Sequence, residues 1–189
     1  MKLKAPLILA SQSPRRSELL RGIGLSFEVQ VRPVDEFFPD DIHPKAVAVL
    51  IAEHKAKAYD DLARTHIVIT ADTIVSLDQK PMGKPADEAE AVRMLRSLSG
   101  QQHYVYTGVT IFFKGKFKSF AEETLVHFRK LSEEEILHYV RTFQPYDKAG
   151  AYGIQEWIGM VGISRIEGDY YNVMGLPLSR LYEELKQID

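Results

Sequence analysis

The chain has 189 residues, 45% of them hydrophobic, which is enough to bury the core of one domain or of two small lobes around a shared cleft. Its formal net charge of −2, from 24 basic and 26 acidic residues, argues against a DNA- or RNA-binding domain, which would carry a basic surface. The sequence has no cysteine, and this excludes disulfides, thiolate metal sites and a cysteine nucleophile.

The hydropathy of the chain predicts a cytoplasmic protein. No stretch approaches the roughly 20 apolar residues that a membrane helix needs. The apolar run at residues 6–10 is too short for the hydrophobic region of a secretion signal.

The first half of the chain alternates predicted strands and helices. Apolar and β-branched runs predict strands at residues 6–10, 27–31 and 67–71, and extended chain at 74–77. Helical spacing predicts helices that follow Ser13-Pro14 and that span 46–62, since serine suits the N-cap and proline the first helical position. Residues 32–44 form an acidic loop with three prolines, Asp72-Thr73 end the strand at 67–71, and residues 78–80 form a turn.

The second half combines a hairpin with further helices. A helix is predicted at residues 87–97, and extended runs at 103–113 and 118–129 flank a turn at 114–116. Ser132 and Glu135 form a capping box before a helix that ends near Thr142. A glycine-rich segment at 147–153 precedes extended segments at 157–166 and 170–174 and a last helix from Pro177. Crossover and hairpin connections together predict an α/β fold with a mixed, twisted sheet and flanking helices.

A basic turn between the first strand and helix is the first candidate site. Ser11, Ser13, Arg15 and Arg16 lie where a helix N-terminus offers backbone N–H groups and a positive dipole end. Serine hydroxyls and guanidinium forks match phosphate oxygens. The same residues also fit an ordinary helix cap with solvated arginines.

Two carboxylates are candidates for metal binding or base catalysis. Asp72, at the predicted end of a buried strand, would point into the crevice where α/β proteins bind ligands. There it could ligate a metal or accept a proton from water, or it could be a turn residue. Glu36 lies in the acidic loop, where a solvated carboxylate is the plain alternative.

Three lysines and one glutamine complete the candidates. Lys55 and Lys57 lie on the second predicted helix, and Lys84 is bracketed by Gly83 and Pro85; solvated lysines are the alternative at each place. Gln155 follows the glycine-rich segment, whose small residues let the backbone approach a ligand, and its amide could bond a base edge.

Taken together, these segments resemble the Maf family of nucleotide pyrophosphatases. The matching stretches are LILASQSPRR, VDE, KAKA, ADTIV, GKP, LSG, DKAGAYGIQ and GDYYNVMGLPL, in family order between residues 7 and 178. The resemblance implies one Maf-like domain over residues 1–189. It also implies an α/β fold with a deep cleft between two lobes, akin to the inosine triphosphate pyrophosphatases.

The resemblance further implies a reaction and the residues that carry it. The reaction is hydrolysis of a nucleoside triphosphate between its α- and β-phosphates with Mg²⁺ or Mn²⁺, often in a homodimer. Asp72 matches the catalytic proton acceptor, and it could instead hold the metal together with Glu36. The positions tied to substrate choice are Arg15, Thr73 and Gln155. The residues that line the phosphate and metal end are Ser11, Ser13, Arg16, Glu36, Lys55 and Lys84.

Within the family, the stretch DKAGAYGIQ resembles the branch that acts on dTTP and UTP, a role in clearing the nucleotide pool. A 7-methyl-GTP pyrophosphatase is the alternative enzyme. A nucleotide-binding regulator of septum formation is the alternative outside enzymology, and it would need the basic turn but neither Asp72 nor Glu36.

Overall fold

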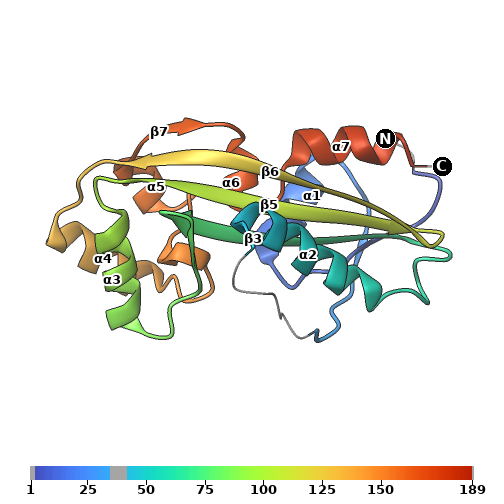
Figure 1. Ribbon diagram of the computed structural model, residues 1–189, viewed down its shortest axis with the longest axis horizontal. Helices are drawn as coiled ribbons and strands as arrows, with labels where there is room; N and C mark the ends of the chain where they lie inside the picture. The colour runs from blue at the N-terminus through green and yellow to red at the C-terminus, as the bar shows by residue number, and fades with distance from the viewer. Residues whose placement is uncertain (1–2, 35–41, 189) are drawn as a thin grey trace.

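A mixed sheet runs through the computed structural model, which describes residues 3–34 and 42–188 (Figure 1). Its seven strands have the order β2-β1-β3-β5-β6-β7, with β4 paired to β3. They are β1 Leu7–Leu9, β2 Glu28–Val29, β3 Ile67–Leu77, β4 Lys80–Met82, β5 Gln102–Phe113, β6 Lys116–Phe128 and β7 Ile163–Glu167. β1 pairs in parallel with β2 and β3, and the other pairings are antiparallel. The predicted mixed α/β sheet is therefore confirmed.

The helices form two groups along the long strands. They are α1 Pro14–Gly22, α2 Pro44–Lys57, α3 Glu88–Leu98, α4 Glu133–Phe143, α5 Trp157–Gly162, α6 Tyr170–Met174 and α7 Leu178–Lys186, with a short 3-10 helix η1 at Ala149–Ala151. Helices α1, α2 and α7 gather near one end of β3, β5 and β6, and α3, α4 and α5 near the other (Figure 1). In the described part of the chain, none of these helices combines the length and apolar character that crossing a bilayer requires.

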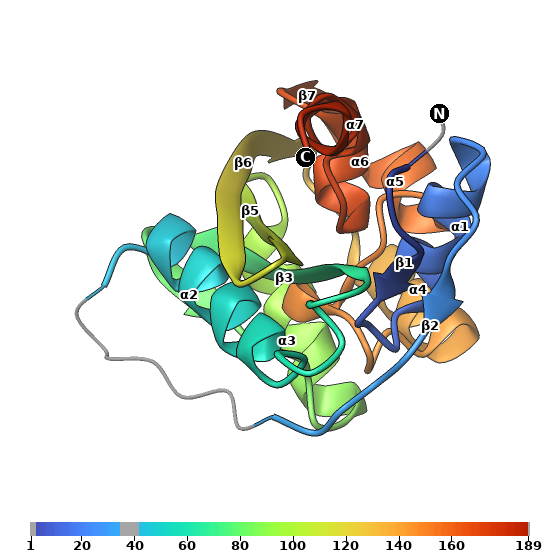
Figure 2. The same ribbon diagram turned by 90° about the vertical axis from the view of Figure 1, so that its right-hand side faces the viewer.

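Both helix groups bury apolar clusters against the sheet. Helices α1 and α7 pack on β1, β3 and β5, and α2 covers the opposite face of the sheet (Figure 2). Helices α3, α4 and α5 pack together on the far halves of the same long strands. The two groups agree with the two lobes expected from the resemblance.

The hairpin and the capping box are confirmed. β5 and β6 pair antiparallel up to Phe113↔Lys116, and Lys114 and Gly115 make the turn with φ of 49° and 74°. Positive φ at both central residues is the geometry that suits a tight two-residue hairpin. At the start of α4, Ser132 and Glu135 each accept a hydrogen bond from the other's backbone N–H.

The predicted break in the third strand is wrong. β3 is continuous, because β5 pairs with it from Val68 to Ser76. Its parallel neighbour β1 stops at Leu9, opposite Ile69. Asp72 therefore lies within β3, just beyond the carboxyl end of β1, instead of at the end of its own strand.

The second helix is shorter than predicted. α2 ends at Lys57, because the amides of Ala58 and Tyr59 turn tightly back to the carbonyls of Lys55 and Ala56, at 3.3 and 3.0 Å. The chain then turns toward β3 without another helical run.

Two segments near the C-terminus were predicted as extended and are helices. Residues 157–162 form α5, and only 163–167 of that segment are a strand. Gly159 explains the turn, because a Cβ there would lie 1.8 Å from the carbonyl oxygen of Ile154. Only a glycine lets the chain fold back so closely.

Residues 170–174 form the single helical turn α6 for a different reason. Asp169 caps it by accepting a hydrogen bond from the Tyr171 amide at 2.8 Å, and Gly175 ends it with a φ of 114°. A cap before the segment and a left-handed glycine after it outweigh the strand preference of its aromatic and β-branched residues.

Candidate active site

Arg16 ties three segments of the chain together beside the end of β1. Its Nη1 donates to Ser11 Oγ at 3.1 Å and to the Ala71 carbonyl at 2.9 Å. Its Nη2 donates to Thr73 Oγ1 at 3.0 Å, and its Nε donates to the Gly175 carbonyl at 2.8 Å. A planar guanidinium is the side chain that can reach acceptors in several directions at once.

Because β1 ends early, a backbone carbonyl of β3 is left for Arg16 to bind. β1 pairs with β3 only as far as Ile69, so the next part of that edge of β3 has no strand beside it in the described residues. The Ala71 carbonyl lies on this edge and accepts from Arg16 instead. Ser13 holds the N-cap position of α1, but its hydroxyl caps none of the described amides of that helix; its own amide donates to Ser11 Oγ at 3.3 Å.

Thr73 extends this cluster into the centre of the sheet. Its Oγ1 lies 3.0 Å from Thr107 Oγ1, which in turn donates to the Asn172 carbonyl at 2.9 Å. The Asn172 amide nitrogen donates to the Val105 carbonyl and to Thr124 Oγ1, both at 3.0 Å. Asn172 thus fixes α6, whose C-terminal Gly175 accepts from Arg16.

Asp72 and Lys55 form a half-buried ion pair. Lys55 Nζ donates to Asp72 Oδ1 at 2.8 Å, and the two side chains are 20% and 16% exposed. α2 brings Lys55 to this position because it lies close against β3, where Thr70 Oγ1 donates to the Ala52 carbonyl at 2.6 Å. Water and salt screen so sheltered a pair less than a surface salt bridge, and removing one partner would leave a poorly solvated charge.

The hydrogen bonds around Arg16 and the Lys55–Asp72 ion pair lie on opposite faces of β3. Side chains alternate along a strand, so Thr70 and Asp72 face α2, whereas Thr73 faces α1 and α6. Both include residues of β3 that lie just past the point where this edge of the strand stops pairing with β1. A ligand at this edge could be contacted from both faces.

Arg15 links the two helix groups. Its Nη1 donates to Asp147 Oδ2 at 2.8 Å, across from α1 to the segment before η1. Lys148 Nζ donates to the other oxygen, Asp147 Oδ1, at 2.7 Å. Burial opposes ionisation of this carboxyl, but the hydrogen bonds from Lys148 and Arg15 outweigh burial and lower the pKa of Asp147.

Lys84 and Gln155 lie on the side of the second helix group. Lys84 is exposed in the loop after β4, and the carbonyl of its neighbour Gly83 accepts from the Gly150 amide at 3.0 Å. Gln155 is half-buried, and its Oε1 is buried with no hydrogen-bond partner among residues 3–34 and 42–188. No hydrogen bond or ion pair in the described chain joins the Lys84 or Gln155 side chain to Arg16, Asp72 or their partners, so a shared site stays a prediction.

The metal expectation rests on one described carboxylate. Glu36 lies outside the described residues, and within them no three His, Cys, Asp or Glu side chains gather as a metal-binding group. Mg²⁺ is usually held by one or two carboxylates together with substrate phosphates. Asp72, with one oxygen bonded to Lys55, fits a metal that arrives with a nucleotide better than a preformed cage.

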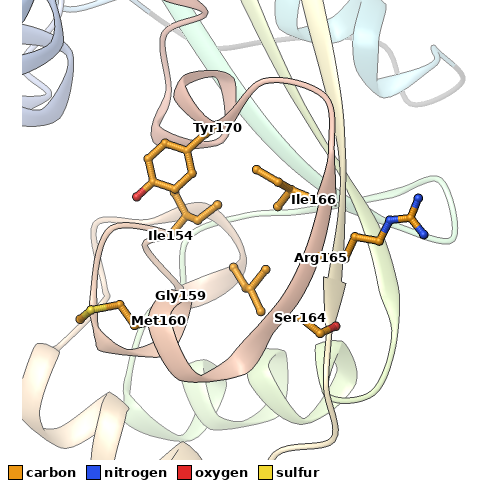
Figure 3. Close-up of a pocket in the computed structure, with 8 residues that line it drawn as sticks. Ile154, Gly159, Met160, Ser164, Arg165, Ile166 and Tyr170 are labelled. Atoms are coloured by element: carbon orange, nitrogen blue, oxygen red, sulfur yellow. The ribbon is translucent and has the colours of Figure 1, made fainter.

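A pocket of about 320 Å³ lies between α5, β7 and α6 (Figure 3). It is lined by Ile154, Gly159, Met160, Ile163, Ser164, Arg165, Ile166 and Tyr170. These residues include none of the site residues expected from the sequence, although Ile154 directly precedes Gln155. The cleft expected between the lobes stays a prediction.

Sequence reasoning missed several residues that build this region. Lys148 and Glu156 flank the segment that carries Gln155 and pair at 3.1 Å, and Asn172 anchors α6. The local signal for Lys148 was its position at the start of the glycine-rich segment, next to a residue of opposite charge, Asp147. No local pattern identifies Asn172, since its partners lie 48 and 67 residues away.

Comparison with known proteins assigns the chain to a family. A family model described as Maf-like protein matches residues 6–188. The chain belongs to the Maf-like family. One relative, from Phocaeicola vulgatus, is named dTTP/UTP pyrophosphatase and is 50% identical over 187 residues, which is 98% of this chain and 97% of the relative.

Other members and a solved structure agree with this assignment. Relatives from Bacteroides thetaiotaomicron and Porphyromonas gingivalis carry the same name and are 50% and 48% identical over 98% and 97% of this chain, and over 97% and 94% of their own. The solved structure of a HAM1 protein from Coxiella burnetii has a TM-score of 0.50 and 15% identity, covering 97% of this chain and 100% of that one. At that identity the likeness supports the α/β fold alone.

Proposed function

We propose that this Maf-like protein hydrolyses the pyrimidine nucleoside triphosphates dTTP and UTP to monophosphate and pyrophosphate, and that it clears them from the cytoplasmic nucleotide pool. The Lys55–Asp72 pair, next to the hydroxyls and guanidinium of the basic turn, is the observation that carries the proposal. The family and the name shared by the relatives support the reaction and the substrates.

Asp72 is the proposed proton acceptor. Water attacks the α-phosphorus, its proton passes to the carboxylate, and the α–β bond breaks to release pyrophosphate. Lys55 orients the carboxylate through its 2.8 Å hydrogen bond to Oδ1. Oδ2 is then the oxygen proposed to accept the proton from water. Asp72 can alternatively ligate the divalent metal.

Phosphate binding is assigned to the basic turn and its neighbours. Arg15 and Lys84 supply charge, and the hydroxyls of Ser11 and Ser13 supply donors at the end of β1. Arg16 holds Ser11 and Thr73 in place through its own hydrogen bonds. Arg15, Thr73 and Gln155 are the proposed contacts that select the nucleotide.

A divalent metal, Mg²⁺ or Mn²⁺, is proposed as the cofactor. It would neutralise charge on the phosphates and polarise the bond that breaks. Asp72 would hold it together with substrate oxygens, and Glu36 is the second ligand proposed from the sequence.

Pyrophosphate release from a nucleotide panel tests this function. The panel contains dTTP, UTP, CTP, dUTP, 7-methyl-GTP, ITP and the common purine triphosphates, each with Mg²⁺ or with Mn²⁺. Turnover led by dTTP and UTP supports the proposal. Turnover led by 7-methyl-GTP would keep the reaction and overturn the substrate, and binding without turnover would favour the regulator.

Replacement of the catalytic carboxylate is the first mutational prediction. Asp72→Asn removes the proton acceptor and keeps the shape, so kcat should fall by about 10²- to 10⁴-fold, the range that a general base contributes. Because asparagine can still accept from Lys55, the variant should still bind the nucleotide, as measured by calorimetry. Full metal-dependent turnover in this variant would show that Asp72 is not catalytic.

A further inference from the structure

A chain of alternating charges runs from the basic turn to the segment that carries Gln155. Arg15 donates to one oxygen of Asp147, and Lys148 donates to the other. Lys148 Nζ also lies 3.1 Å from Glu156 Oε1. Of these four groups Lys148 is the most enclosed, with a side chain that is 10% exposed.

Helix α4 holds Glu156, the last member of this series of charged side chains. The Tyr139 hydroxyl on that helix donates to Glu156 Oε2 and accepts from the Gly153 amide at 3.0 Å. Both oxygens of Glu156 are therefore bonded inside the protein, one to Lys148 and one to Tyr139. Burial and the Glu156 hydrogen bond raise the pKa of Tyr139, so this hydroxyl remains a donor across the neutral range.

These contacts clamp a turn of four residues. The Glu156 amide donates to the Gly153 carbonyl at 3.0 Å, which closes the turn around Ile154 and Gln155. Gly153 is packed so closely that a Cβ there would lie 3.0 Å from the Glu156 carboxyl carbon and 3.2 Å from Lys148 Cε. Lys148 thus bounds the turn both by charge and by contact.

Gln155 is the residue that this turn presents. Its Oε1 is buried without a hydrogen-bond partner in the described part of the chain. A buried amide oxygen without a partner costs free energy, and such atoms are uncommon in folded proteins. The position of this amide is therefore set by the backbone of the turn and not by bonds of its own oxygen.

We propose that Lys148 is a positioning residue for base selection, which holds the 153–156 turn through Glu156 so that Gln155 meets the base edge. This inference rests on the proposed function. An amide held with Oε1 toward N3–H and Nε2 toward O4 matches uracil or thymine. Cytosine reverses donor and acceptor at these two positions, so it would match only if the amide flipped, and in this proposal the clamped turn keeps the amide in one orientation. UTP and CTP differ only at that edge, so their ratio of kcat/KM isolates the contact.

The effect of losing Lys148 follows from the geometry. Lys148→Met keeps the stem of the side chain and removes its charge, which leaves the Glu156 carboxylate in a sheltered place without its cation. The turn then shifts to rehydrate Glu156, and Gln155 moves with it. A displacement on the order of 1 Å is enough for a large loss, so we expect the UTP:CTP ratio of kcat/KM to fall by about 10-fold.

Two comparisons separate positioning from loss of stability. Lys118→Met is the matched control, because Lys118 also bridges two partners, Glu184 at 2.5 Å and Gln187 at 2.8 Å, but in the first helix group. It should lower the melting temperature without changing the UTP:CTP ratio. Tripolyphosphate, used as a competitive inhibitor, has no base, so its inhibition constant measures any effect of Lys148→Met that reaches the phosphate end through Asp147 and Arg15. The UTP:CTP ratio cancels such an effect, because both nucleotides share the same phosphates.

The decisive measurement combines Lys148→Met with Gln155→Ala. If Lys148 acts through Gln155, the substitution Lys148→Met should lower the UTP:CTP ratio of kcat/KM in the wild-type background but not in the Gln155→Ala background. Glu156→Gln, which preserves shape, should lower the ratio in the same direction and replaces Lys148→Met if that variant does not fold.

Each other result overturns the inference. An equal fall in kcat/KM for both nucleotides, or an additive effect in the double variant, would mean that Lys148 only stabilises the fold. Absence of turnover of any nucleotide by the wild-type enzyme would instead reject the proposed function, and this inference with it.

Discussion

At the scale of single residues, Arg16 does the most to assemble the site. Its guanidinium donates to acceptors on the basic turn, on β3 and at the end of α6. Each hydrogen bond from a charged group contributes about 1.5–3 kcal/mol when its acceptor would otherwise be left without a partner. A lysine could replace one or two of these bonds but not the fork.

Arg16→Lys should therefore lower both stability and activity. We expect a loss of about 3 kcal/mol in the free energy of unfolding, measured with urea, since two or more hydrogen bonds disappear. Turnover should fall as well, because Ser11 and Thr73 lose their common partner. Arg64→Lys is the control: Arg64 is 77% exposed in its pair with Asp60, and its replacement should change stability by less than about 0.5 kcal/mol. Equal effects of the two substitutions would refute this role for Arg16.

At the scale of elements, the close approach of α2 to the sheet determines where Lys55 lies. Gly108 on β5 is directly beside Asp72 in the sheet. A Cβ on Gly108 would lie 2.3 Å from the Ala48 carbonyl carbon and oxygen of α2. The absence of a side chain at this one position lets the helix come close enough for Lys55 to reach Asp72.

Gly108→Ala should displace α2 and weaken the Lys55–Asp72 pair. The added methyl meets backbone that cannot rotate away, so we expect a loss of about 1–3 kcal/mol in unfolding free energy. We also expect kcat/KM to drop by about 10-fold, since a shift on the order of 1 Å separates the pair. Gly22→Ala is the matched control, because a Cβ at Gly22 meets nothing within 4 Å. Wild-type kcat/KM in Gly108→Ala would show that the helix position does not matter for the reaction.

The elements that could be predicted from the sequence are those with local signals. The Lys114-Gly115 turn and the Ser132–Glu135 capping box are specified by neighbouring residues, and both were found. The α6 turn was missed because its aromatic residues favour strands, although its own cap at Asp169 was a local signal. The continuity of β3 depends on its pairing with β5, which no local pattern reveals.

In the site, too, residues with a local sequence signal could be predicted and contacts between distant residues could not. The basic turn and Asp72 could be singled out from residue type and position, and the resemblance to the family added their roles. The Arg15–Asp147 pair could not be predicted, since its residues are 132 positions apart. The division of the site between the two faces of β3 also depended on knowing where β1 ends.

At the scale of the whole molecule, four apolar clusters of the described residues pack on one sheet, and a buried histidine lies against one of them. His103 on β5 is 1% exposed and packs among the apolar residues of the α3, α4 and α5 group. Its Nε2 lies 2.7 Å from the Tyr152 hydroxyl oxygen, and its Nδ1 has no hydrogen-bond partner among the described residues. Burial, with a smaller contribution from His127, lowers the pKa of His103 from 6.5 to about 3.

This histidine should make the stability of the fold depend on pH in a window of its own. Between pH 6.5 and about 3 the unfolded chain binds a proton at His103 that the folded chain does not, so stability is lost as pH falls below 6.5. The slope is about 1.4 kcal/mol per pH unit, which amounts to about 2 kcal/mol between roughly pH 7.5 and 5. Asp61 and Glu135, whose pKa values are lowered to about 2 by Arg32 and Arg129, lose their contributions only below their ordinary values of 3.8 and 4.5.

Urea titrations at several pH values check this expectation. His103→Gln can keep a hydrogen bond to Tyr152 and removes the titrating group, so its free energy of unfolding should change less over that window than that of the wild type. His54→Gln, at an exposed position on α2, should keep the wild-type slope. Because the carboxylates do not contribute until lower pH, an unchanged slope in His103→Gln would mean that His103 is solvated or protonated in the folded state.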